Sequence, residues 1–456
     1  MGIHLDSFAS CNLGERIGQC RAVPVRLADR EAVLLVHAPD FDVDPWYDMF
    51  FFPSGTLKLS LLGLDGELLW RRDLGRSVVP GMYFCPVLAF DLDGDGVDEL
   101  WFVNNHDPLH PLALRHYHLE RLDPRDGRST GSWPWPVDGV YGESSSAAFR
   151  FFLVGGHAHG QPVLVAARGT YGAMELRGLA PDLSERWCRR IAANEPGARG
   201  SHMCPVADLD HDGVDELLWG ERCIAFDDGR ERFCADRDVY RGHSDIVQPV
   251  LDRVSGDWSI YTCREGDQRA APRVVCYDAD GRRLWGDLEH GHMDMGWVAR
   301  LGEAGEHVAS AVRIGAKTCG PDGRHHREIE EFAWELGGGR PLQLGFSTYH
   351  TIPVDLDGDG RHELVRGLPG GNGEVLDHCG ARIASVGGAV ALACRFDATR
   401  AGEQLLSYHE DGMVRLWSDR AAVDTPAALA RYAHPSYVAN RRLGASGQNL
   451  VVLGGI

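Results

Sequence analysis

The chain has 456 residues, of which 44% are hydrophobic and 25% charged, so it can bury a sizeable core and is not a disordered polypeptide. Its formal net charge of −20 argues against a nucleic-acid partner, because phosphate binding needs a basic surface. No apolar stretch is long enough to span a membrane, and residues 1–20 lack the basic start and apolar run of a signal peptide. We therefore expect no membrane partner, and a cytoplasmic protein, or an extracellular one if a leader has been removed.

Glycine and proline are frequent throughout (56 Gly and 23 Pro), which predicts many short strands joined by tight turns. One phrase recurs along the chain, and each copy predicts a hairpin of two apolar strands around an acidic or Gly-rich turn. The strong copies are CPVLAFDLDGDGVDEL (85–100), CPVADLDHDGVDEL (204–217) and IPVDLDGDGRHEL (352–364). Weaker copies begin at Pro24, Pro249, Trp297 and Cys394.

A second type of hairpin lies between these copies. Its examples are LLGLDGELLW (61–70), ERLDPRDGRSTGSW (120–133), CYDADGRRLW (276–285) and VRLWSDRAAV (414–423). Two hairpins make a four-stranded unit of roughly 42 to 65 residues, which is the size of a propeller blade. We predict an all-β fold in which residues 1–456 form a single β-propeller domain of seven or eight four-stranded blades, with residues 1–20 as an N-terminal extension.

The acidic turns have the spacing of a cation-binding loop, DxDxDGxxE. Oxygen ligands at loop positions 1, 3, 5 and 9 can wrap one hard cation, and the residue after the glycine offers its backbone carbonyl. Strands rather than helices flank these turns, and no Glu stands at position 12, so they differ from EF-hands. We predict about three structural Ca²⁺ sites, each pinning a hairpin turn at the rim of a blade. Their ligands are Asp91, Asp93, Asp95, Val97 and Glu99; Asp208, Asp210, Asp212, Val214 and Glu216; and Asp355, Asp357, Asp359, Arg361 and Glu363.

Polar side chains recur at equivalent positions of the repeats, and equivalent positions lie at equivalent heights around a propeller axis. Histidines or tyrosines precede the inner hairpins, twice in a GHxD phrase, and arginines follow the second strand, 20 or 21 residues after His202, His243 and His292. Because a pair of antiparallel strands returns the chain to the end where it began, each His and its Arg should approach the same face. The first group is Tyr83, His202, His350, His243 with Asp245, and His292 with Asp294; the second is His106, Arg168 with Tyr171, Arg222, Arg264, Arg313 and Arg366.

This set of side chains suits β-elimination at a uronic acid, in which the C5 proton is removed and the oxygen on C4 is expelled. Arg neutralises the carboxylate next to C5, and His or Tyr can take one proton and supply the other. We assign catalytic roles to His202, His243, Tyr171, Arg222 and Arg264, and substrate binding to His106, His292, His350, Arg313 and Tyr240.

Two other functions compete with this prediction. A glycoside hydrolase needs a pair of carboxylates, and Asp245, Asp294 and Glu221 could supply them because no other role is assigned to these residues. A non-catalytic calcium-binding propeller would use the same face to hold a carbohydrate or protein partner. Such a module has no need to gather His and Tyr around Arg.

The DLDGDGVDEL loop, together with the phrases GSHMCPV and YRGHSDIVQP, resembles the propeller-type polysaccharide lyases. The nearest resemblance is to ulvan lyases and L-rhamnose-α-1,4-D-glucuronate lyases, with rhamnogalacturonan lyases more distant, and it runs from about Asp42 to the end of the chain. It implies cleavage of a rhamnose-(1,4)-glucuronate linkage in an acidic ulvan-type or arabinogalactan-type polysaccharide or oligosaccharide. Those families place paired histidines on adjacent strands, whereas here His202 is matched by Arg222, and Tyr83 holds a slot that a His could fill. The identity of the base therefore stays open.

Overall fold

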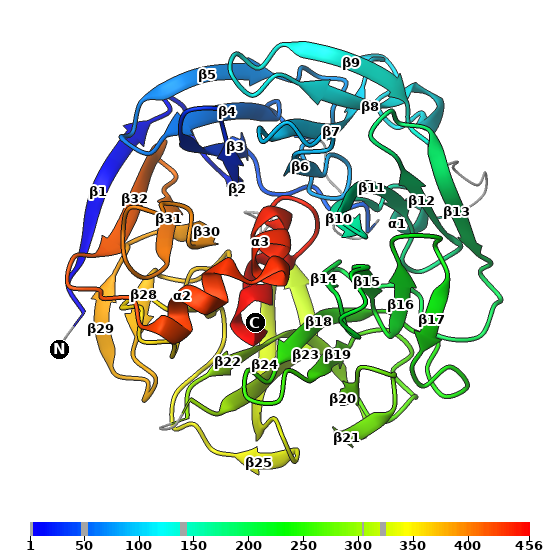
Figure 1. The fold of residues 1–456 in the computed structure, drawn as a ribbon, viewed down its shortest axis with the longest axis vertical. Coiled ribbons are helices and arrows are strands. Elements are labelled where there is room, and N and C mark those ends of the chain that lie inside the picture. The colour runs from blue at the N-terminus through cyan, green and yellow to red at the C-terminus, as the bar shows by residue number, and fades with distance from the viewer. Residues whose placement is uncertain (1–2, 47–52, 137–143, 303–304, 320–324) are drawn as a thin grey trace.

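The fold is a ring of eight antiparallel four-stranded sheets (Figure 1). The computed structural model describes residues 3–46, 53–136, 144–302, 305–319 and 325–456. Within these ranges each sheet is a propeller blade, so the predicted all-β propeller is confirmed and the blade count is eight.

The strands run from the centre of the ring outward in each blade (Figure 1). The first three blades are β2 (Gln19–Arg26), β3 (Glu31–Ala38), β4 (Lys58–Gly63) and β5 (Leu68–Asp73); β6 (Val87–Phe90), β7 (Glu99–Asn105), β8 (Tyr117–Leu122) and β9 (Ser129–Pro134); and β10 (Phe151–Ala158), β11 (Gln161–Arg168), β12 (Met174–Leu179) and β13 (Glu185–Ile191). The next three are β14 (Val206–Ala207), β15 (Glu216–Trp219), β16 (Arg222–Ala225) and β17 (Glu231–Cys234); β18 (Ser244–Leu251), β19 (Trp258–Arg264), β20 (Val274–Asp278) and β21 (Arg283–Asp287); and β22 (His292–Arg300), β23 (His307–Cys319), β24 (His325–Glu335) and β25 (Arg340–Leu342). The last two are β26 (Ile352–Val354), β27 (Glu363–Val365), β28 (Glu374–Leu376) and β29 (Arg382–Ser385); and β30 (Ala389–Cys394), β31 (Gln404–Tyr408), β32 (Met413–Asp419) and β1 (Leu5–Asn12).

The eighth blade closes the ring by pairing the first strand of the chain with the last one. Strand β1 pairs antiparallel with β32, in a register that runs from Leu5 opposite Asp419 to Asn12 opposite Met413. Within the segment that the sequence suggested as an extension, residues 5–12 thus supply the outer strand of a blade. This pairing ties residues far apart in sequence and leaves no gap in the ring.

Burial falls from the inner to the outer strand of a blade, because neighbouring blades cover both faces of the inner strands. Every residue of β18 is buried, whereas β21 at the outside has exposed positions. Tryptophans of the outer hairpins join successive blades. The indole of Trp187 donates to the carbonyl of Phe226 in the next blade at 2.8 Å, and it packs on Gly229, where a Cβ would lie 2.4 Å from the ring. Trp187 is therefore a packing residue between blades.

A helical segment near the C-terminus covers the centre of the ring (Figure 1). It contains α2 (Pro426–Ala433), α3 (Pro435–Asn440), η2 (Arg441–Leu443) and η3 (Asn449–Gly455); two other short helices are η1 (Leu114–His116) and α1 (Ser145–Ala148). Thr425 caps α2 by accepting from the amide of Ala428, and a proline begins the helix. None of the helices in the described ranges is both long and apolar enough to cross a membrane.

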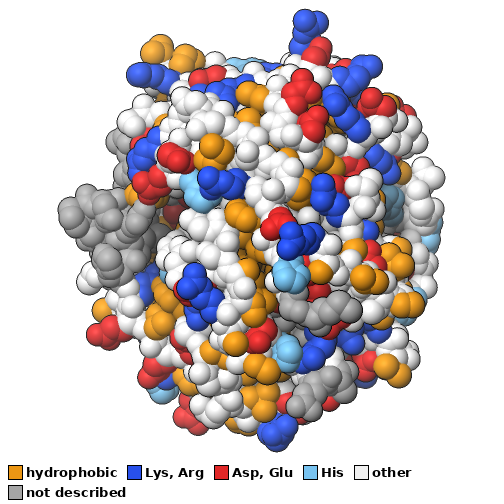
Figure 2. Space-filling view, turned by 90° about the vertical axis from the view of Figure 1, so that its left-hand side faces the viewer, with side chains coloured by type: hydrophobic (Ala, Val, Ile, Leu, Met, Phe, Trp, Pro, Cys, Tyr) orange, Lys and Arg blue, Asp and Glu red, His pale blue; other side chains and the backbone are white. Residues whose placement is uncertain are grey.

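The inner strands position functional groups at both of their ends. The acidic turns join β6 to β7, β14 to β15 and β26 to β27, whereas His243 and His292 lie where β18 and β22 begin. The outer flank shows no dominant charge of one sign, since basic and acidic side chains are interspersed in Figure 2. Specific chemistry is therefore to be sought at the ends of the inner strands.

Candidate functional site

A cavity of about 1580 Å³ opens where the inner strands begin. Its wall includes side chains from loops and strand ends of several blades. The polar groups that concern us here are Asp44, Arg150, Tyr171, Arg199, His202, Arg241, His243, Asp245, Glu265, His292, Asp294, Arg327 and His350.

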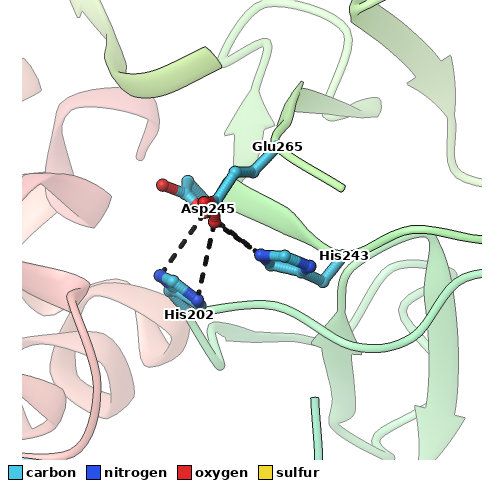
Figure 3. A group of neighbouring side chains, drawn as sticks. All are labelled: His202, His243, Asp245 and Glu265. Carbon is cyan, nitrogen blue, oxygen red and sulfur yellow. Dashed lines mark hydrogen bonds and ion pairs between the residues drawn. The ribbon is translucent and has the colours of Figure 1, made fainter. Parts of the chain in front are cut away.

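Four buried side chains converge at the centre of this wall (Figure 3). The Nε2 atom of His243 lies 2.5 Å from Oε2 of Glu265, and Nδ1 of His202 lies 3.4 Å from Oδ1 of Asp245. One ligand atom from each of His202, His243, Asp245 and Glu265 lies within 4.8 Å of the others. This spacing allows the four side chains to hold one cation.

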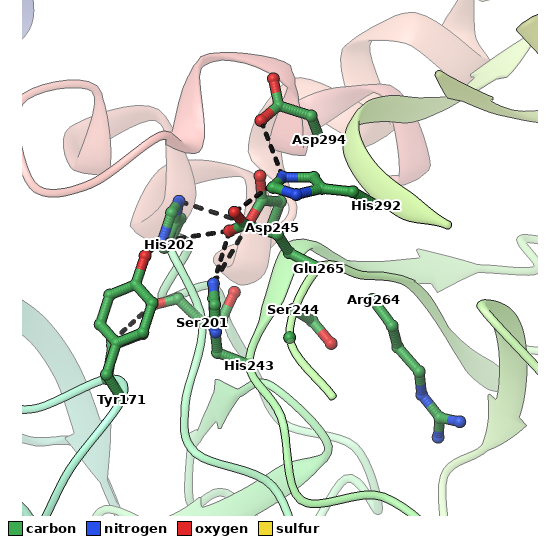
Figure 4. A network of polar contacts seen from close by, with 12 residues as sticks. Tyr171, Ser201, His202, His243, Ser244, Asp245, Arg264, Glu265, His292 and Asp294 are labelled. Carbon is green, nitrogen blue, oxygen red and sulfur yellow. Dashed lines mark hydrogen bonds and ion pairs between the residues drawn. The ribbon is translucent and has the colours of Figure 1, made fainter. Parts of the chain in front are cut away.

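A second group shares two carboxylates with the first (Figure 4). His292 Nε2 lies 2.7 Å from Oε1 of Glu265 and 3.3 Å from Oδ1 of Asp294, and the Asp294 carboxylate forms an ion pair with Arg327. Asp245, Glu265, His292 and Asp294 again bring four ligand atoms within 4.8 Å of one another. The cluster as a whole thus contains three imidazoles and three carboxylates, and we call these six residues the central cluster.

Strand irregularities aim the carboxylates of the central cluster. The pairing of β18 with β19 skips Asp245, and the pairing of β22 with β23 skips Asp294, so each GHxD phrase ends in a β-bulge. A bulged residue is released from the ladder and its side chain is turned locally. Glu265 reaches the cluster because it directly follows the last residue of β19.

The electrostatics of the cluster favour the ionised form of Glu265. Burial by itself would raise the pKa of Glu265, but the neighbouring His243 and His292 hold that pKa well below its usual value. Imidazole and carboxylate are ligands that divalent transition metals accept. Because buried carboxylates need a compensating charge, the central cluster fits a divalent cation.

Tyr171 lies against the cluster and is held in a strained conformation. Its backbone has φ of 76°, and that of Thr170 has φ of 101°, values that residues with side chains rarely adopt. The Tyr171 hydroxyl lies 3.2 Å from Nε2 of His202 and 3.4 Å from Nη2 of Arg150. Burial raises the pKa of Tyr171, as do Glu265 and other acidic neighbours, so the hydroxyl keeps its proton at neutral pH.

Arg150 provides a positive charge at the edge of the cavity. Its guanidinium lies 4.1 Å from the ring centre of Tyr83 and 4.9 Å from that of Tyr171, and it pairs with Asp44 at 2.9 Å. Within the described part of the chain, Nε and Nη1 of this buried group have no hydrogen-bond partner. Because these two nitrogens are buried, Arg150 would act on an anionic ligand through its charge.

The structure brings His202, His243, His292 and Tyr171 together, as the sequence suggested. His350 also lines the cavity, stacked on Tyr349 with ring centres 3.7 Å apart. Burial and the nearby Arg327 lower its pKa to about 4, so this imidazole is neutral at neutral pH.

Arg222 and Arg264 do not reach the cavity, which corrects the expectation that each His and its Arg approach one face. Arg264 is buried between its own blade and the preceding one, where Nε lies 2.9 Å from Glu221 and Nη2 lies 2.6 Å from Asp236. Cross-strand pairing does place Arg264 opposite Ser244. Successive side chains of a strand alternate in direction, so Glu265 points to the cluster and Arg264 points away from it (Figure 4).

Arg222 is buried in an equivalent way. Its guanidinium donates to the carbonyls of Pro196 and Ala198, at 2.6 and 2.8 Å, and pairs with Glu231. A buried cation with these partners stabilises the loop that it contacts and is not free to bind a substrate carboxylate.

Three further residues assigned to substrate binding lie outside the cavity wall. Tyr240 is buried under Arg264, whose guanidinium lies 4.2 Å from its ring centre, and its hydroxyl donates to the carbonyl of His243. Arg313 on β23 pairs with Glu330. His106 is on the loop after β7 and stacks on His118. Tyr240 thus supports the site from behind, whereas Arg313 and His106 contribute no surface to the cavity.

Several cavity residues were missed by the sequence prediction. Glu265 stands directly after Arg264, so counting one residue further along the repeat would have found it. Arg150 directly precedes β10, the inner strand of a blade without an acidic turn, and Arg327 lies on the long hairpin β23–β24, which has no counterpart in the repeat. Arg199 and Arg241 come from loops that have no repeat pattern.

The acidic turns bring their carboxylates together as predicted, but only in part. The groups with ligand atoms within 4.8 Å are Asp91, Asp93 and Glu99; Asp208, Asp210 and Glu216; and Asp355, Asp357 and Asp359. In all three turns the Glu accepts from the amide that follows the first Asp, at 2.9 Å. Asp95 and Asp212 are outside these groups and accept from the amides of Val97 and Val214 instead.

Two curated proteins are similar in sequence to this chain. One is rhamnogalacturonan exolyase YesX of Bacillus subtilis (strain 168), 24% identical over 347 residues, which are 63% of this chain and 56% of that protein. The other is rhamnogalacturonan endolyase YesW of the same organism, 26% identical over 375 residues, which are 68% of this chain and 60% of that protein. The alignments thus span less than two thirds of the length of these relatives. No protein-family profile matches the chain.

Solved structures show the same fold over almost the whole chain. The exotype rhamnogalacturonan lyase YesX superposes with a TM-score of 0.77 at 18% identity, covering 97% of this chain and 80% of the other. A Bacillus licheniformis rhamnogalacturonan lyase gives 0.75 at 18% identity, covering 98% and 80%. The similar proteins named here are rhamnogalacturonan lyases, which the sequence resemblance had placed further away than ulvan lyases.

Proposed function

We propose that the protein is a polysaccharide lyase that cleaves a uronate-containing glycan by β-elimination. The observation that carries this proposal is the contact of the Tyr171 hydroxyl with His202 at 3.2 Å, on the wall of a large cavity lined by both arginine and carboxylate side chains. The similarity to two rhamnogalacturonan lyases supports the same reaction class. Rhamnogalacturonan is therefore the first substrate to test.

The proposed reaction uses Tyr171 as the acid and His202 as the base. His202 takes the C5 proton, the electrons of that C–H bond form the C4–C5 double bond, and the C4–O bond breaks. Tyr171, which keeps its proton at neutral pH, gives it to the departing oxygen. Asp245, 3.4 Å from Nδ1 of His202, stabilises the imidazolium. Because the Tyr171 hydroxyl contacts His202 Nε2, the proton on His202 can return to Tyr171 and restore the site.

The substrate carboxylate must be neutralised before C5 becomes acidic. Arg222 and Arg264 are buried elsewhere, so we assign this role to Arg150 and Arg241, which both line the cavity. Asp245, Glu265, His292 and Asp294 can hold a divalent cation without using His202. Such a cation, when bound, would supply further positive charge to the carboxylate.

A second substrate class is favoured by the position of the acid beside the base. In galacturonate the C5 hydrogen and O4 lie on opposite faces of the sugar ring, whereas in glucuronate they lie on the same face. Adjacent groups such as Tyr171 and His202 suit elimination on one face, which favours a rhamnose-(1,4)-glucuronate linkage. Galacturonate would need a partner across the ring, and neutral His350, three blades further round the propeller, is the candidate.

The experiment offers rhamnogalacturonan and glucuronate-containing glycans, such as ulvan and arabinogalactan, in parallel. A lyase product carries a C4–C5 double bond conjugated to the carboxylate and absorbs in the ultraviolet. If the ultraviolet absorbance rises with only one of these polymers, the uronate of that polymer is the one that the enzyme cleaves. New reducing ends without this absorbance would show that the protein is a glycoside hydrolase and not a lyase. Binding of a polymer without any product would show a non-catalytic carbohydrate-binding propeller.

We further propose that the three acidic turns hold structural Ca²⁺. The support is the shared arrangement of their carboxylates and the dense oxygen ligands, which suit a hard cation. Their distance from the central cluster, at the other end of the inner hairpins, argues for a role in stability rather than in the reaction.

A further inference from the structure

The loop between β11 and β12, residues 169–173, turns abruptly before it presents Tyr171 to the cavity. Three successive residues have positive φ: 147° at Gly169, 101° at Thr170 and 76° at Tyr171. Glycine adopts such values readily, whereas a β-branched residue such as Thr170 does so only under strain. Strain of this kind persists only where the surrounding structure holds the conformation in place. The contacts of Thr170 should therefore show what this conformation is for.

The side chain of Thr170 supplies one of the restraints. It is completely buried, and its Oγ1 donates a hydrogen bond to the carbonyl of Ser201 at 3.3 Å. A glycine at this position would relieve the strain but would have no hydroxyl to donate. The threonine thus ties the loop that carries Tyr171 to the segment that carries His202.

That second segment is itself fixed by backbone contacts. The amide of His202 donates to the carbonyl of Ser244 at 3.1 Å, and the amide of Gln448 donates to the carbonyl of His202 at 2.8 Å. The carbonyl of Ser201 also accepts from the indole of Trp219 at 3.2 Å. The segment therefore offers a fixed backbone against which the loop of Tyr171 can be positioned.

Two neighbouring contacts join the loop and the segment, which meet at the central cluster in Figure 4. Thr170 contacts Ser201 in the interior. The residues that directly follow them, Tyr171 and His202, make the 3.2 Å contact at the cavity. Because the Cα atoms of consecutive residues are only about 3.8 Å apart, a shift of Thr170 is passed on to Tyr171. The buried hydrogen bond is thus placed to set the distance between the proposed acid and base.

We propose that Thr170 is a positioning residue, whose buried hydrogen bond to Ser201 holds the Tyr171 hydroxyl within reach of His202. This inference rests on the roles proposed above for Tyr171 and His202. Thr170 itself does not contact the reacting atoms and acts only through the position of Tyr171. The strained backbone is kept because a threonine, unlike a glycine, can make this tie.

The variants Thr170→Val and Thr170→Ser separate the hydrogen bond from the shape of the side chain. Valine is β-branched like threonine but cannot donate, whereas serine keeps the hydroxyl. In Thr170→Val the Ser201 carbonyl keeps the Trp219 indole as its partner, so this buried acceptor is not left unpaired. Both variants should therefore fold, and melting curves check this.

Crystal structures of the full chain give a measurement that does not depend on activity. We expect the Tyr171 hydroxyl within hydrogen-bond distance of His202 in wild type and Thr170→Ser, and beyond about 3.5 Å in Thr170→Val. Thr262→Val is the matched control and should keep the contact, since Thr262 is also completely buried but donates to Glu221 from a strand of another blade. A Tyr171–His202 contact that survives in Thr170→Val overturns the inference, whatever reaction the protein catalyses.

Steady-state kinetics test the consequence for the reaction. Thr170→Val should lower kcat by about 10- to 100-fold, as a misplacement of about 1 Å does. It should leave KM near its wild-type value, because Arg150 and Arg241 still attract the substrate carboxylate, and Thr170→Ser should restore most of the turnover. In a Tyr171→Phe background, Thr170→Val should have no further effect, since the hydroxyl that it positions is already absent.

The outcomes separate this inference from the proposed function. An equal fold-loss of kcat in both backgrounds would show that Thr170 does not act through Tyr171, and would overturn the inference while the lyase reaction stands. If wild type forms no lyase product with any of the polymers, the proposed function fails. The crystal structures would then still decide whether Thr170 positions Tyr171 against His202.

Discussion

The two ends of the inner hairpins present similar ligands that are assembled in different ways. Each acidic turn draws its carboxylates from nine consecutive residues, such as Asp91 to Glu99, and needs only one hairpin. The central cluster takes His202, His243 and His292 from the starts of three successive blades, so it exists only when those blades are packed. An acidic turn can therefore stabilise its own blade independently of the others. The central cluster, and with it the proposed reaction, depends on the packing of several blades.

The largest expected effect is a loss of turnover when residues at the central cluster are replaced. Tyr171→Phe and His202→Ala should each reduce kcat by about 10²- to 10⁴-fold, the contribution of a positioned acid or base, and should change melting little. Turnover and melting temperature are measured on the same preparations. Tyr349→Phe, another tyrosine of the cavity wall, is the control and should keep its activity. If Tyr171→Phe and His202→Ala both turn over substrate normally, this pair has no part in the reaction.

The buried and exposed arginines should separate stability from binding. Arg264→Met leaves Glu221 buried without its partner, which typically costs about 3–5 kcal/mol in the free energy of unfolding. Arg241→Met, at an exposed position on the cavity wall, should change that free energy by no more than about 0.5 kcal/mol but raise KM. Chemical denaturation and steady-state kinetics measure the two effects. A stable Arg264→Met variant with impaired catalysis would restore the role that the sequence suggested.

Removal of Ca²⁺ from the acidic turns should lower the stability of the fold. It should not change the turnover of the molecules that remain folded. Cations that bind only the folded state contribute about 2–4 kcal/mol per site at saturation. A chelator should therefore lower the melting temperature, and Asp93→Asn should reduce the calcium-dependent part of that shift. Asp126→Asn, an exposed acid on the outer hairpin of the same blade, is the control. A melting temperature that is independent of both Ca²⁺ and chelator would contradict calcium in the turns.

The smallest expected effect concerns pH, at a site unconnected with either end. Burial, together with the nearby Arg71 and Lys58, lowers the pKa of His37 to about 3, compared with about 6.5 in an unfolded chain. Between these values the unfolded state binds more protons, so stability falls as the pH decreases from about 6.5 towards 3.

His37→Gln, which can still bond to Ser60, should be less stable at pH 7 and lose less stability on acidification. Denaturant midpoints at pH 7 and pH 4.5 measure this. Parallel acid sensitivity in wild type and variant would assign it to other groups, such as the histidines of the central cluster.

Much of the fold follows from local patterns that repeat. A blade consists of two hairpins. The apolar strands and turn residues of each hairpin lie within about 20 positions, so the sequence repeat predicts the hairpin directly. The count of eight depended on the closing blade, because nothing in residues 5–12 indicates that they pair with β32 across the whole chain.

The candidate site was predictable only where side chains follow the repeat. His202, His243 and His292 stand at equivalent repeat positions, and so do the three acidic turns. The sequence by itself therefore determined that the members of each set share a height on the propeller. Which face of a strand a side chain takes was decided by the folded chain. Bulges at Asp245 and Asp294 turn those carboxylates inward, and strand alternation sends Glu265 to the cluster and Arg264 to the contact with the preceding blade.

The sequence therefore determined the β-propeller, its acidic turns and the ring of histidines, because these depend on interactions within one hairpin or on simple repetition. Only the tertiary structure decided which charges meet in the cavity. Arg150, Arg241 and Arg327 line the cavity from irregular loops and a long hairpin. Arg222 instead pairs with Glu231 outside the cavity. Contacts between blades set these positions, and no pattern along a single hairpin encodes them.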